Sequence, residues 1–373
     1  MNVLYVCNDH AYFEAHRRWL VDEAETRGMN VRVACGGLEA GTIGRRHIEF
    51  PLDIKRHHFD AWSDMRLLFV LAYLAHRTKA DVVHLITIKP ILFGAIGLRL
   101  LAPKKRIIAT FPGLGRMFDD TDTHWKAHLR RSLVVLGLKF GLGSRRTRAI
   151  VETQSDREKL TNLGVVDAEQ SIHIPGAGVD PAIFTARPLP RGPMRLLFAG
   201  RLLKKKGVHA FAGAASLLTE QSAHVRFILA GSMEANDPDG LDASDIATLQ
   251  ANPNVEFMGH VPPSDMPNLL ASIHAVILPT TYQEGIPRIL IEASAVGRPC
   301  IVSDNPGCLA IIQNDVNGVV LAKADARHIA DVVLALTKDR EKLARMSANA
   351  VRLFRSGSFE IAAIADQTLA TYS

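Results

Sequence analysis

The feature that most constrains this chain is an alternation between short apolar runs and helix-length amphipathic segments, repeated through both halves of the sequence. Strand-like runs that alternate with helical patterns predict βα units and parallel sheets. Strands are predicted over 3–6, 31–35, 82–85, 107–111 and 149–153, and again over 194–199, 226–230, 255–258, 275–278, 300–303 and 318–321. Helices are predicted between them over 12–26, 64–78, 91–101, 124–141, 208–218, 266–272, 287–296 and 326–336. The expected fold class is therefore α/β, with two Rossmann-like domains.

A Pro- and Gly-rich stretch ending in Arg-Pro-Leu-Pro-Arg-Gly-Pro (187–193) interrupts the alternation and is predicted to be a linker. A chain of 373 residues suits two domains of ordinary size. We expect an N-terminal domain over 1–185, a C-terminal domain over 186–356 and a last helix within 357–373. The sequence leaves open whether that helix crosses back to the first domain.

The positive charge is unevenly distributed. Residues 1–186 hold 26 Lys and Arg against 20 Asp and Glu, whereas 187–373 hold 18 of each, so the net charge of +6 lies in the first half. Segment 124–148 carries seven Lys or Arg and no acid among its leucines and valines. This pattern suits an anionic membrane surface; the alternative is a packed helix with a solvated basic edge. Nucleic acid is not expected, because aromatic residues make up only 6% of the chain.

Other signals bear on compartment and cofactors. The cysteines Cys7, Cys35, Cys300 and Cys308 form no CxxC pair and are predicted to be reduced thiols. The N-terminus runs straight into a strand pattern, and no apolar run approaches the roughly 18 residues of a membrane span. The sequence therefore predicts a cytoplasmic protein, with attachment to the cytoplasmic face of the inner membrane as an option. No metal and no cofactor are expected.

The segment from Glu284 to Glu292 reads as a loop and a helix that follow a strand. Pro287 suits the first turn of that helix. The N–H groups of Arg288, Ile289 and Leu290 would then point out of the helix terminus, where a diphosphate gains hydrogen bonds and a favourable dipole. The carboxylates of Glu284 and Glu292 would accept hydrogen bonds from the hydroxyl groups of a sugar and a ribose. The alternative is that Glu284 caps the helix and Glu292 is a solvated helical residue.

A second cluster, from Gly200 to Gly207, also follows a predicted strand. Arg201 and Lys206 could place two cations beside a leaving diphosphate. The alternative is a solvated basic turn.

The order and spacing of these motifs resemble those of the retaining glycosyltransferases of family 4, which have the GT-B fold. The resemblance covers roughly 195–320: Gly200-Arg201-x4-Lys206-Gly207, Phe257-Met-Gly259-His260, Glu284-Gly-x-Pro287-x4-Glu292, Gly307 and Asn317-Gly318. In the first half it is carried by Asp81-Val-Val-His84, Lys89-Pro90 and Phe111-Pro-Gly113-Leu-Gly115. The last element is similar to bacterial enzymes that add a sugar to polyprenyl-diphosphate-linked saccharides.

The resemblance implies a central cleft between the domains, with a nucleotide sugar on the second and the acceptor on the first. It implies that Arg201 and Lys206 hold the donor diphosphate without a metal and that Glu284 contacts the donor sugar. The implied donor-binding residues are Gly200, Gly231, His260, Val261, Gly285, Ile286, Arg288, Ile289, Leu290 and Glu292. The implied acceptor-side residues are His10, His16, Lys89, Gly113, Gly115 and Arg116. A UDP-hexose or UDP-N-acetylhexosamine is the expected donor, ahead of GDP-mannose.

Two departures from the family pattern affect the first half. The segment from Asn8 to Arg17 lacks the glycines that many relatives carry after the first strand, and Phe111-Pro-Gly113 stands where many carry a histidine. His10, His16 and His84 are the candidates to substitute for that histidine.

Alternative functions stay open. They are a nucleotide-sugar epimerase or glycogen-synthase-like transferase of the same architecture, and a non-catalytic nucleotide-sugar-binding subunit. The Asp-x-Asp triplets at 120–122 and 237–239 are assigned to loops rather than to a metal site.

Overall fold

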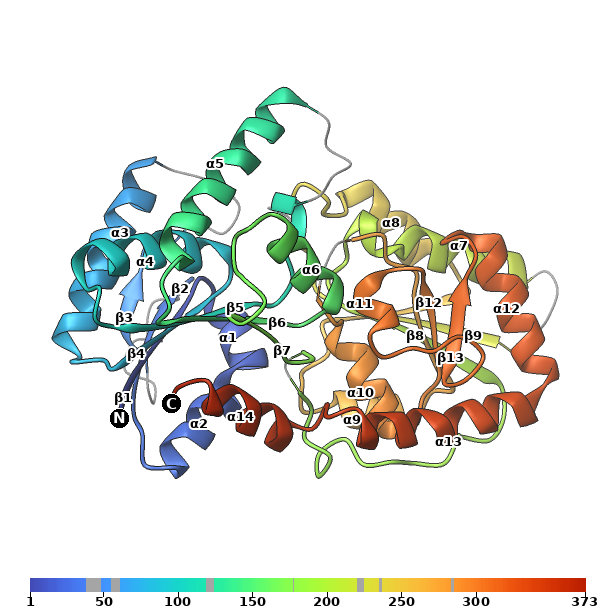
Figure 1. Cartoon of the computed structure of the whole chain (residues 1–373). Helices are drawn as coiled ribbons and strands as arrows, with labels where there is room; N and C mark the ends of the chain where they lie inside the picture. The colour runs from blue at the N-terminus through green and yellow to red at the C-terminus, as the bar shows by residue number, and fades with distance from the viewer. Residues whose placement is uncertain are drawn as a thin grey trace. The chain divides into compact units, whose positions relative to one another are not determined.

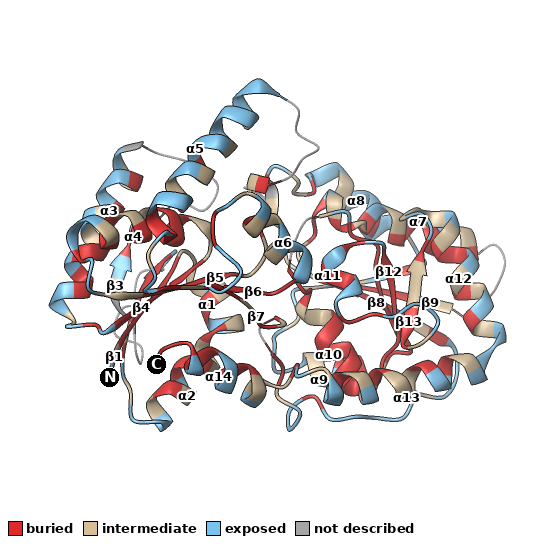
Figure 2. Cartoon of the chain, viewed as in Figure 1, coloured by how far each residue is buried: buried red, intermediate tan, exposed pale blue. Residues whose placement is uncertain are grey.

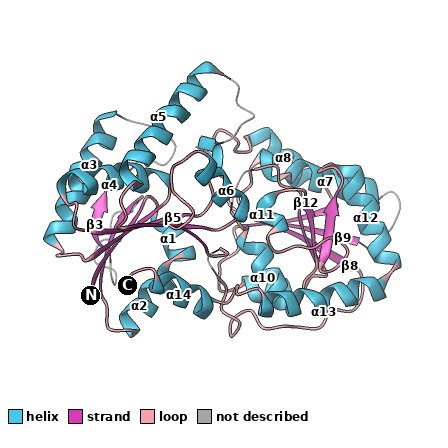
Figure 3. Cartoon of the chain, viewed as in Figure 1, coloured by secondary structure: helices cyan, strands magenta, loops and turns pink. Residues whose placement is uncertain are grey.

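The computed structural model describes residues 1–37, 48–54, 61–118, 124–176, 178–219, 225–234, 237–282 and 285–373. The chain divides into two compact units (Figure 1). Unit 1 comprises Met1–Ala177 and Ile361–Ser373, and unit 2 comprises Gly178–Glu360. Both contain a parallel β-sheet covered by helices on its faces, as Figure 3 shows. The predicted α/β class with two parallel sheets is confirmed.

The sheet of unit 1 has the order β3-β2-β1-β4-β5-β6-β7. Its strands are β1 (Asn2–Cys7), β2 (Asn30–Gly36), β3 (Ile48–Leu52), β4 (Val82–Ile86), β5 (Arg106–Phe111), β6 (Thr147–Val151) and β7 (Ser171–His173). All pairings are parallel, and the chain winds outward in both directions from β1 and β4, as in a doubly wound sheet. The edge strands β3 and β7 were not predicted from the sequence.

Helices cover both faces of this sheet. They are α1 (His10–His16), α2 (Arg18–Thr26), α3 (Ala61–Arg77), α4 (Ile88–Leu101), α5 (Trp125–Leu142), α6 (Gln154–Asn162) and α14 (Ile361–Ala370), with a short 3-10 helix η1 (Gly115–Phe118). Successive strand residues point to opposite faces: Leu4 packs in the core beneath α3, α4 and α5, whereas Tyr5 packs in the core beneath α2 and α14. The C-terminal helix thus covers one face of the unit 1 sheet. The sequence left open whether this helix crosses back to the first domain, and in the structure it belongs to unit 1.

The sheet of unit 2 has the order β10-β9-β8-β11-β12-β13, again with parallel pairs. Its strands are β8 (Met194–Ala199), β9 (Val225–Ala230), β10 (Val255–Gly259), β11 (Ala275–Leu278), β12 (Cys300–Ser303) and β13 (Gly318–Leu321). The helices are α7 (Val208–Thr219), α8 (Ala243–Ala251), α9 (Met266–Ala271), α10 (Arg288–Val296), α11 (Pro306–Leu309), α12 (Ala326–Lys338) and α13 (Arg340–Ser356), and η2 (Lys204–Lys206) is a 3-10 turn. The chain reverses its direction of winding between β8 and β11.

The Pro-rich stretch predicted as a linker is part of unit 2. The Arg187 N–H donates to the Val296 carbonyl at 3.1 Å. The buried guanidinium of Arg298 donates to the carbonyls of Arg187 and Pro188 at 2.8 and 2.9 Å. The chain passes between units at 177/178 and returns at 360/361, whereas the sequence placed these boundaries at 185/186 and 356/357.

Among the described residues, no helix has the length and apolar character needed to cross a membrane.

Candidate functional site

The loops that follow β8 and β11 meet at the carboxyl edge of the unit 2 sheet. The Thr281 N–H donates to the Lys205 carbonyl at 2.7 Å. Gly207 has a φ of +82°, and a Cβ there would collide with the carbonyl oxygen of Pro279. The chain reverses its direction of winding between these two strands, and open α/β sheets bind ligands outside the carboxyl ends of their strands at such a point. Two motifs that are far apart in sequence are thus neighbours.

The carboxyl ends of β9 and β10 lie at the same edge of the unit 2 sheet. Gly200 donates its N–H to the Ala230 carbonyl at 3.1 Å, and Gly231 donates to the Gly259 carbonyl at 2.7 Å. A Cβ at Gly231 would overlap the carbonyl oxygen of Gly200, so only glycine permits this approach. After Gly259, His260 is exposed and Val261 packs against the unit 2 core. The structure therefore places Gly200, Gly231 and the His260 loop along one edge.

Arg201 is oriented by a residue that was not assigned a role from the sequence. Its Nη1 lies 3.5 Å from Oδ2 of Asp237, whose side chain is 1% exposed, and its guanidinium lies 5.6 Å from the Tyr282 ring centre. Asp237 also accepts the Asp239 N–H at 2.9 Å. The triplet 237–239 is thus a turn, as predicted, whose first carboxylate binds Arg201. Arg201 remains 24% exposed at its side chain, enough to reach a ligand.

Lys206 is a buried residue of η2, in the loop that begins at Gly200. A Cβ at Gly200 would lie 3.8 Å from the Lys206 ammonium nitrogen, so the ammonium lies beside the Gly200 backbone. Glu284 lies outside the described residues.

The N-terminus of α10 lies at the same edge and differs in two respects from the prediction. The helix begins at Arg288, and Pro287 is its N-cap rather than its first helical residue. The Leu290 N–H donates to the Pro287 carbonyl at 2.9 Å, so it is used within the first turn; the expectation that it points outward is corrected. The N–H groups of Arg288 and Ile289 occupy positions that have no acceptor within a helix. Gly285 and Ile286, which precede them, are buried.

Glu292 and Arg288 form an ion pair across one turn of α10. The Arg288 Nε donates to Glu292 Oε1 at 2.7 Å, and Glu292 is buried. Burial raises the pKa of Glu292 above its ordinary value, and the Arg288 guanidinium opposes that rise. The sequence assigned Arg288 only an N–H role, although its spacing of four residues from Glu292 is the signal of a helical pair.

The predicted acceptor-side residues follow three adjacent strands of unit 1. His10 opens α1, after β1, and its Nε2 lies 3.7 Å from Glu14, while the His16 ring stacks on Tyr12 with centres 4.6 Å apart. Gly113 and Gly115 follow β5 with φ values of +133° and +56°. The side chain of Arg116 is outside the description.

Lys89, after β4, differs from its expected role. Its ammonium lies 3.0 Å from Oδ1 of Asp64, and both side chains are buried. This pair joins α3 to α4, so Lys89 acts in packing rather than at an open acceptor surface.

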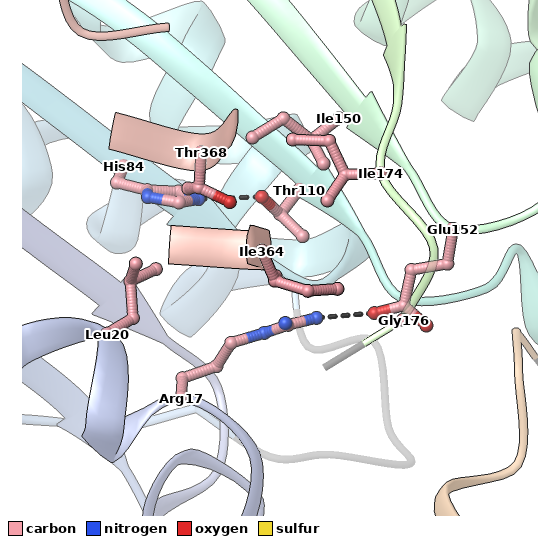
Figure 4. Close-up of a pocket in the computed structure, with 10 residues that line it drawn as sticks. All are labelled: Arg17, Leu20, His84, Thr110, Ile150, Glu152, Ile174, Gly176, Ile364 and Thr368. Atoms are coloured by element: carbon pink, nitrogen blue, oxygen red, sulfur yellow. Dashed lines mark hydrogen bonds and ion pairs between the residues drawn. The ribbon is translucent and has the colours of Figure 1, made fainter. Parts of the chain in front are cut away.

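His84 is likewise unsuited to proton transfer. Its Nδ1 and Nε2 lie 2.6 Å from the hydroxyls of Tyr372 and Thr110, and burial lowers its pKa to about 3. Figure 4 shows the small cavity that it lines, with the Arg17 guanidinium paired to Glu152 at 2.5 Å on the other side. The cavity volume is about 10 Å³, room for about one water molecule. His84 is therefore neutral and fixed, and its candidacy as a catalytic histidine is corrected.

The part of the chain that the structure describes contains no group of three or more His, Cys, Asp or Glu side chains arranged to hold a metal ion. The four cysteines are buried in the cores of the two units and form no disulfide.

Residues 180–352 match the family model "Glycosyl transferases group 1". The chain is 29% identical over 142 residues to the capsular polysaccharide biosynthesis glycosyltransferase CapM of Staphylococcus aureus, covering 38% of this chain and 36% of CapM. It is 25% identical over 318 residues to an N,N'-diacetylbacillosaminyl-diphospho-undecaprenol alpha-1,3-N-acetylgalactosaminyltransferase of Campylobacter jejuni, covering 80% and 79% of the two chains. A UDP-Gal:alpha-D-GlcNAc-diphosphoundecaprenol alpha-1,3-galactosyltransferase of Escherichia coli is 27% identical, with coverage of 74% and 72%.

Solved structures share the fold of the whole chain. Sucrose-phosphate synthase of Thermosynechococcus elongatus superposes with a TM-score of 0.81 at 18% identity, covering 100% of this chain and 98% of the other. HepE of Anabaena, in complex with UDP, gives 0.75 at 18% identity, covering 100% and 99%. The chain thus has the GT-B fold, and its residues 180–352 match the model of the glycosyl transferases group 1 family.

Proposed function

We propose that the protein is a retaining glycosyltransferase of bacterial polysaccharide or glycan biosynthesis. In this proposal it moves a hexosyl or N-acetylhexosaminyl group from a UDP-sugar to a saccharide carried on a lipid diphosphate. The observation that carries the proposal is the meeting of Arg201, Lys206 and the N-terminus of α10 at one edge of the unit 2 sheet. The relatives that act on diphospho-undecaprenol saccharides support the acceptor class.

The donor diphosphate would lie against the N-terminus of α10. The N–H groups of Arg288 and Ile289 would donate to one phosphate, while Lys206 and Arg201 pair with the other. These cations and the helix dipole neutralise the charge that develops on the leaving UDP, which is the role that a metal plays in other transferases. We therefore propose that transfer needs no metal and no cofactor.

The proposed transfer breaks one bond and forms another. The bond between the anomeric carbon and the diphosphate oxygen breaks, and its electron pair goes to the leaving UDP. The acceptor hydroxyl oxygen forms the new bond from the same face, which retains the configuration, and its proton goes to a phosphate oxygen. The Glu284 carboxylate would accept hydrogen bonds from hydroxyls of the donor sugar. The Glu292 carboxylate, held in place by Arg288, would accept hydrogen bonds from the ribose hydroxyls.

Unit 1 would bind the acceptor at the membrane. Segment 124–148, which includes α5, carries seven Lys or Arg and no acid. Large apolar side chains are exposed on α3 and on α5: Trp62, Met65, Phe69 and Tyr73, and Trp125, Leu129, Leu133, Leu136 and Phe140. Exposed apolar residues beside a basic helix suit the interface of an anionic bilayer. We propose peripheral attachment to the cytoplasmic face of the inner membrane.

The test is donor binding followed by transfer, both with EDTA present. UDP or a UDP-sugar should raise the melting temperature of the purified protein by mass action, and GDP and ADP should not. Labelled sugar should then pass to a lipid extract in the wild type and not in Lys206→Ala or Glu284→Gln. Normal transfer by those variants would contradict the site, and release of an epimerised sugar without an acceptor would contradict the transferase assignment.

A further inference from the structure

A second hollow lies in unit 1, between α4 and α5, and its lining includes Trp125, Leu129 and Leu133 of the exposed apolar side chains on α5. Its volume is about 530 Å³, within the roughly 300–1,000 Å³ of small-molecule sites. Leu92, Phe93 and Ile96 of α4 form one wall, and Leu129 and Leu133 of α5 form the other. A hollow with these walls suits a hydrocarbon rather than a sugar or a nucleotide.

The helices form a groove because they approach closely at one end only. A Cβ at Gly137 would lie 2.7 Å from the Leu92 side chain, and one at Gly141 would lie 2.8 Å from the Ala95 Cβ. These glycines seat the C-terminal half of α5 on α4. In the N-terminal half, none of the described residues 125–133 is buried, and Figure 2 shows these turns as exposed or intermediate. Leu129 and Leu133 keep 53% and 61% of their surface exposed, so the groove is open along its α5 side.

The open end of the groove is cationic. Lys126 and Arg130 line it together with Trp125, and the Lys126 ammonium lies 5.7 Å from the Trp125 ring centre. Segment 124–148 contains no acidic residue that could neutralise them. An apolar trough with two cations at its rim is complementary to a hydrocarbon chain that ends in a phosphate.

The position of the groove relates it to the acceptor. Helix α4 begins at Ile88, directly after β4, and α5 connects the carboxyl edge of the sheet, after β5, to the start of β6. The groove residues lie at 92–96 of α4, within its first three turns, and at 125–137 of α5, so the groove extends toward the carboxyl edge from which both helices start. That edge is where open α/β sheets bind ligands, and it holds Gly113 and Gly115.

We infer that the groove between α4 and α5 binds the hydrocarbon chain of the lipid that carries the acceptor saccharide, with Lys126 and Arg130 paired to its phosphate groups. This inference rests on the proposed function and adds to it the residues that recognise the lipid. The groove would hold the chain segment nearest the phosphate and present the attached saccharide to the carboxyl edge of unit 1.

The test compares two exposed leucines of unit 1. Leu133 lines the groove and is 61% exposed, whereas Leu100, near the end of α4, is 57% exposed and does not line it. Geranylgeranyl monophosphate, kept below its micellar concentration, is titrated into the 373-residue chain by calorimetry. We expect Leu133→Asp to weaken binding at least about tenfold, because it places a charge in the trough, and Leu100→Asp to leave binding unchanged. Lys126→Glu with Arg130→Glu should weaken binding of the phosphate but not of geranylgeraniol.

Activity supplies an independent readout. Leu133→Asp should raise KM for a prenyl-linked acceptor without lowering kcat, and should not affect a chainless acceptor analogue. Equal losses in Leu133→Asp and Leu100→Asp, or binding of inorganic phosphate as tight as that of the lipid, would overturn the groove assignment. Equal competition by phosphatidylglycerol vesicles would overturn the choice of the acceptor lipid as occupant.

Donor binding separates this inference from the proposed function. If UDP raises the melting temperature and the prenyl phosphate does not bind, the groove inference alone fails. If no nucleotide binds, the proposed function fails, and the two leucine variants still report on the groove.

Discussion

The Arg201 guanidinium lies 3.5 Å from the carboxylate of Asp237, a side chain that is almost completely buried. An arginine held by a buried carboxylate has fewer orientations to lose when it binds a phosphate. Asp237 therefore acts as a positioning residue for the cation that we assign to the donor diphosphate.

Asp237→Asn should raise KM for the donor more than it lowers kcat. The amide keeps the size of the side chain and an acceptor for the Asp239 N–H but removes the charge that orients Arg201. Since Arg201 is partly exposed, we expect a change of about 1 kcal/mol, or roughly fivefold in KM. Asp242→Asn is the control, because Asp242 is an exposed partner of Lys204 and asparagine also caps a helix. Steady-state kinetics that show equal effects of both variants would contradict this role.

The ion pair of Arg288 and Glu292 predicts a pH effect on donor binding. Burial raises the pKa of Glu292, and Arg288 opposes the rise. Removing the cation in Arg288→Gln should therefore raise this pKa further. The carboxylate would then be protonated at a higher pH, so the acidic limb of the profile of kcat/KM for the donor should move to higher pH. In Glu292→Gln the carboxylate is absent, so its contribution to donor binding should be lost at all pH values. If the acidic limb stays in place in Arg288→Gln, the result would argue against the ion pair.

Gly207 offers a test of the contact between the loops after β8 and β11. Gly207→Ala should destabilise unit 2 by about 1–2 kcal/mol through its positive φ, plus about 1–3 kcal/mol through overlap with the Pro279 carbonyl. Gly28→Ala is matched in strain, with a φ of +76° and open space around the added methyl group. Calorimetry should show a larger loss for Gly207→Ala, together with a weaker thermal response to UDP. Equal losses would mean that the loops do not constrain each other.

The fold could be predicted from the sequence where the signal is local. The predicted strands 194–199, 275–278 and 300–303 coincide with β8, β11 and β12, because central parallel strands are continuous apolar runs. The edge strand β3 contains Pro51, a residue that argues against a strand. The predicted helix 12–26 divides at Arg17, whose side chain turns inward to pair with Glu152. Such a contact between distant residues leaves no local signal.

The same limit applies to the candidate site. Gly200, Gly207 and Gly231 lie where backbone approaches backbone, and glycine-rich turns after strands indicate such places. The pairing of Arg201 with Asp237 joins two loops, and nothing in either segment indicates it. The buried pairs of His84 and Lys89 also depend on tertiary neighbours, Tyr372 and Asp64, so the sequence suggested functional roles for two residues that take part in packing.

His84 makes the stability of unit 1 depend on pH in a defined direction. Its pKa is about 3 in the folded protein, against an ordinary value of 6.5, because burial disfavours the imidazolium. Between these values the unfolded chain binds a proton that the folded protein does not, so this contribution is complete above pH 6.5 and is lost as the pH falls toward 3. The slope for one such group approaches about 1.4 kcal/mol per pH unit. His84→Gln should be less stable than the wild type at pH 7, but the difference should shrink between pH 6.5 and 5. Urea unfolding of both proteins across this range checks the prediction, and parallel pH profiles would show that His84 does not titrate on unfolding.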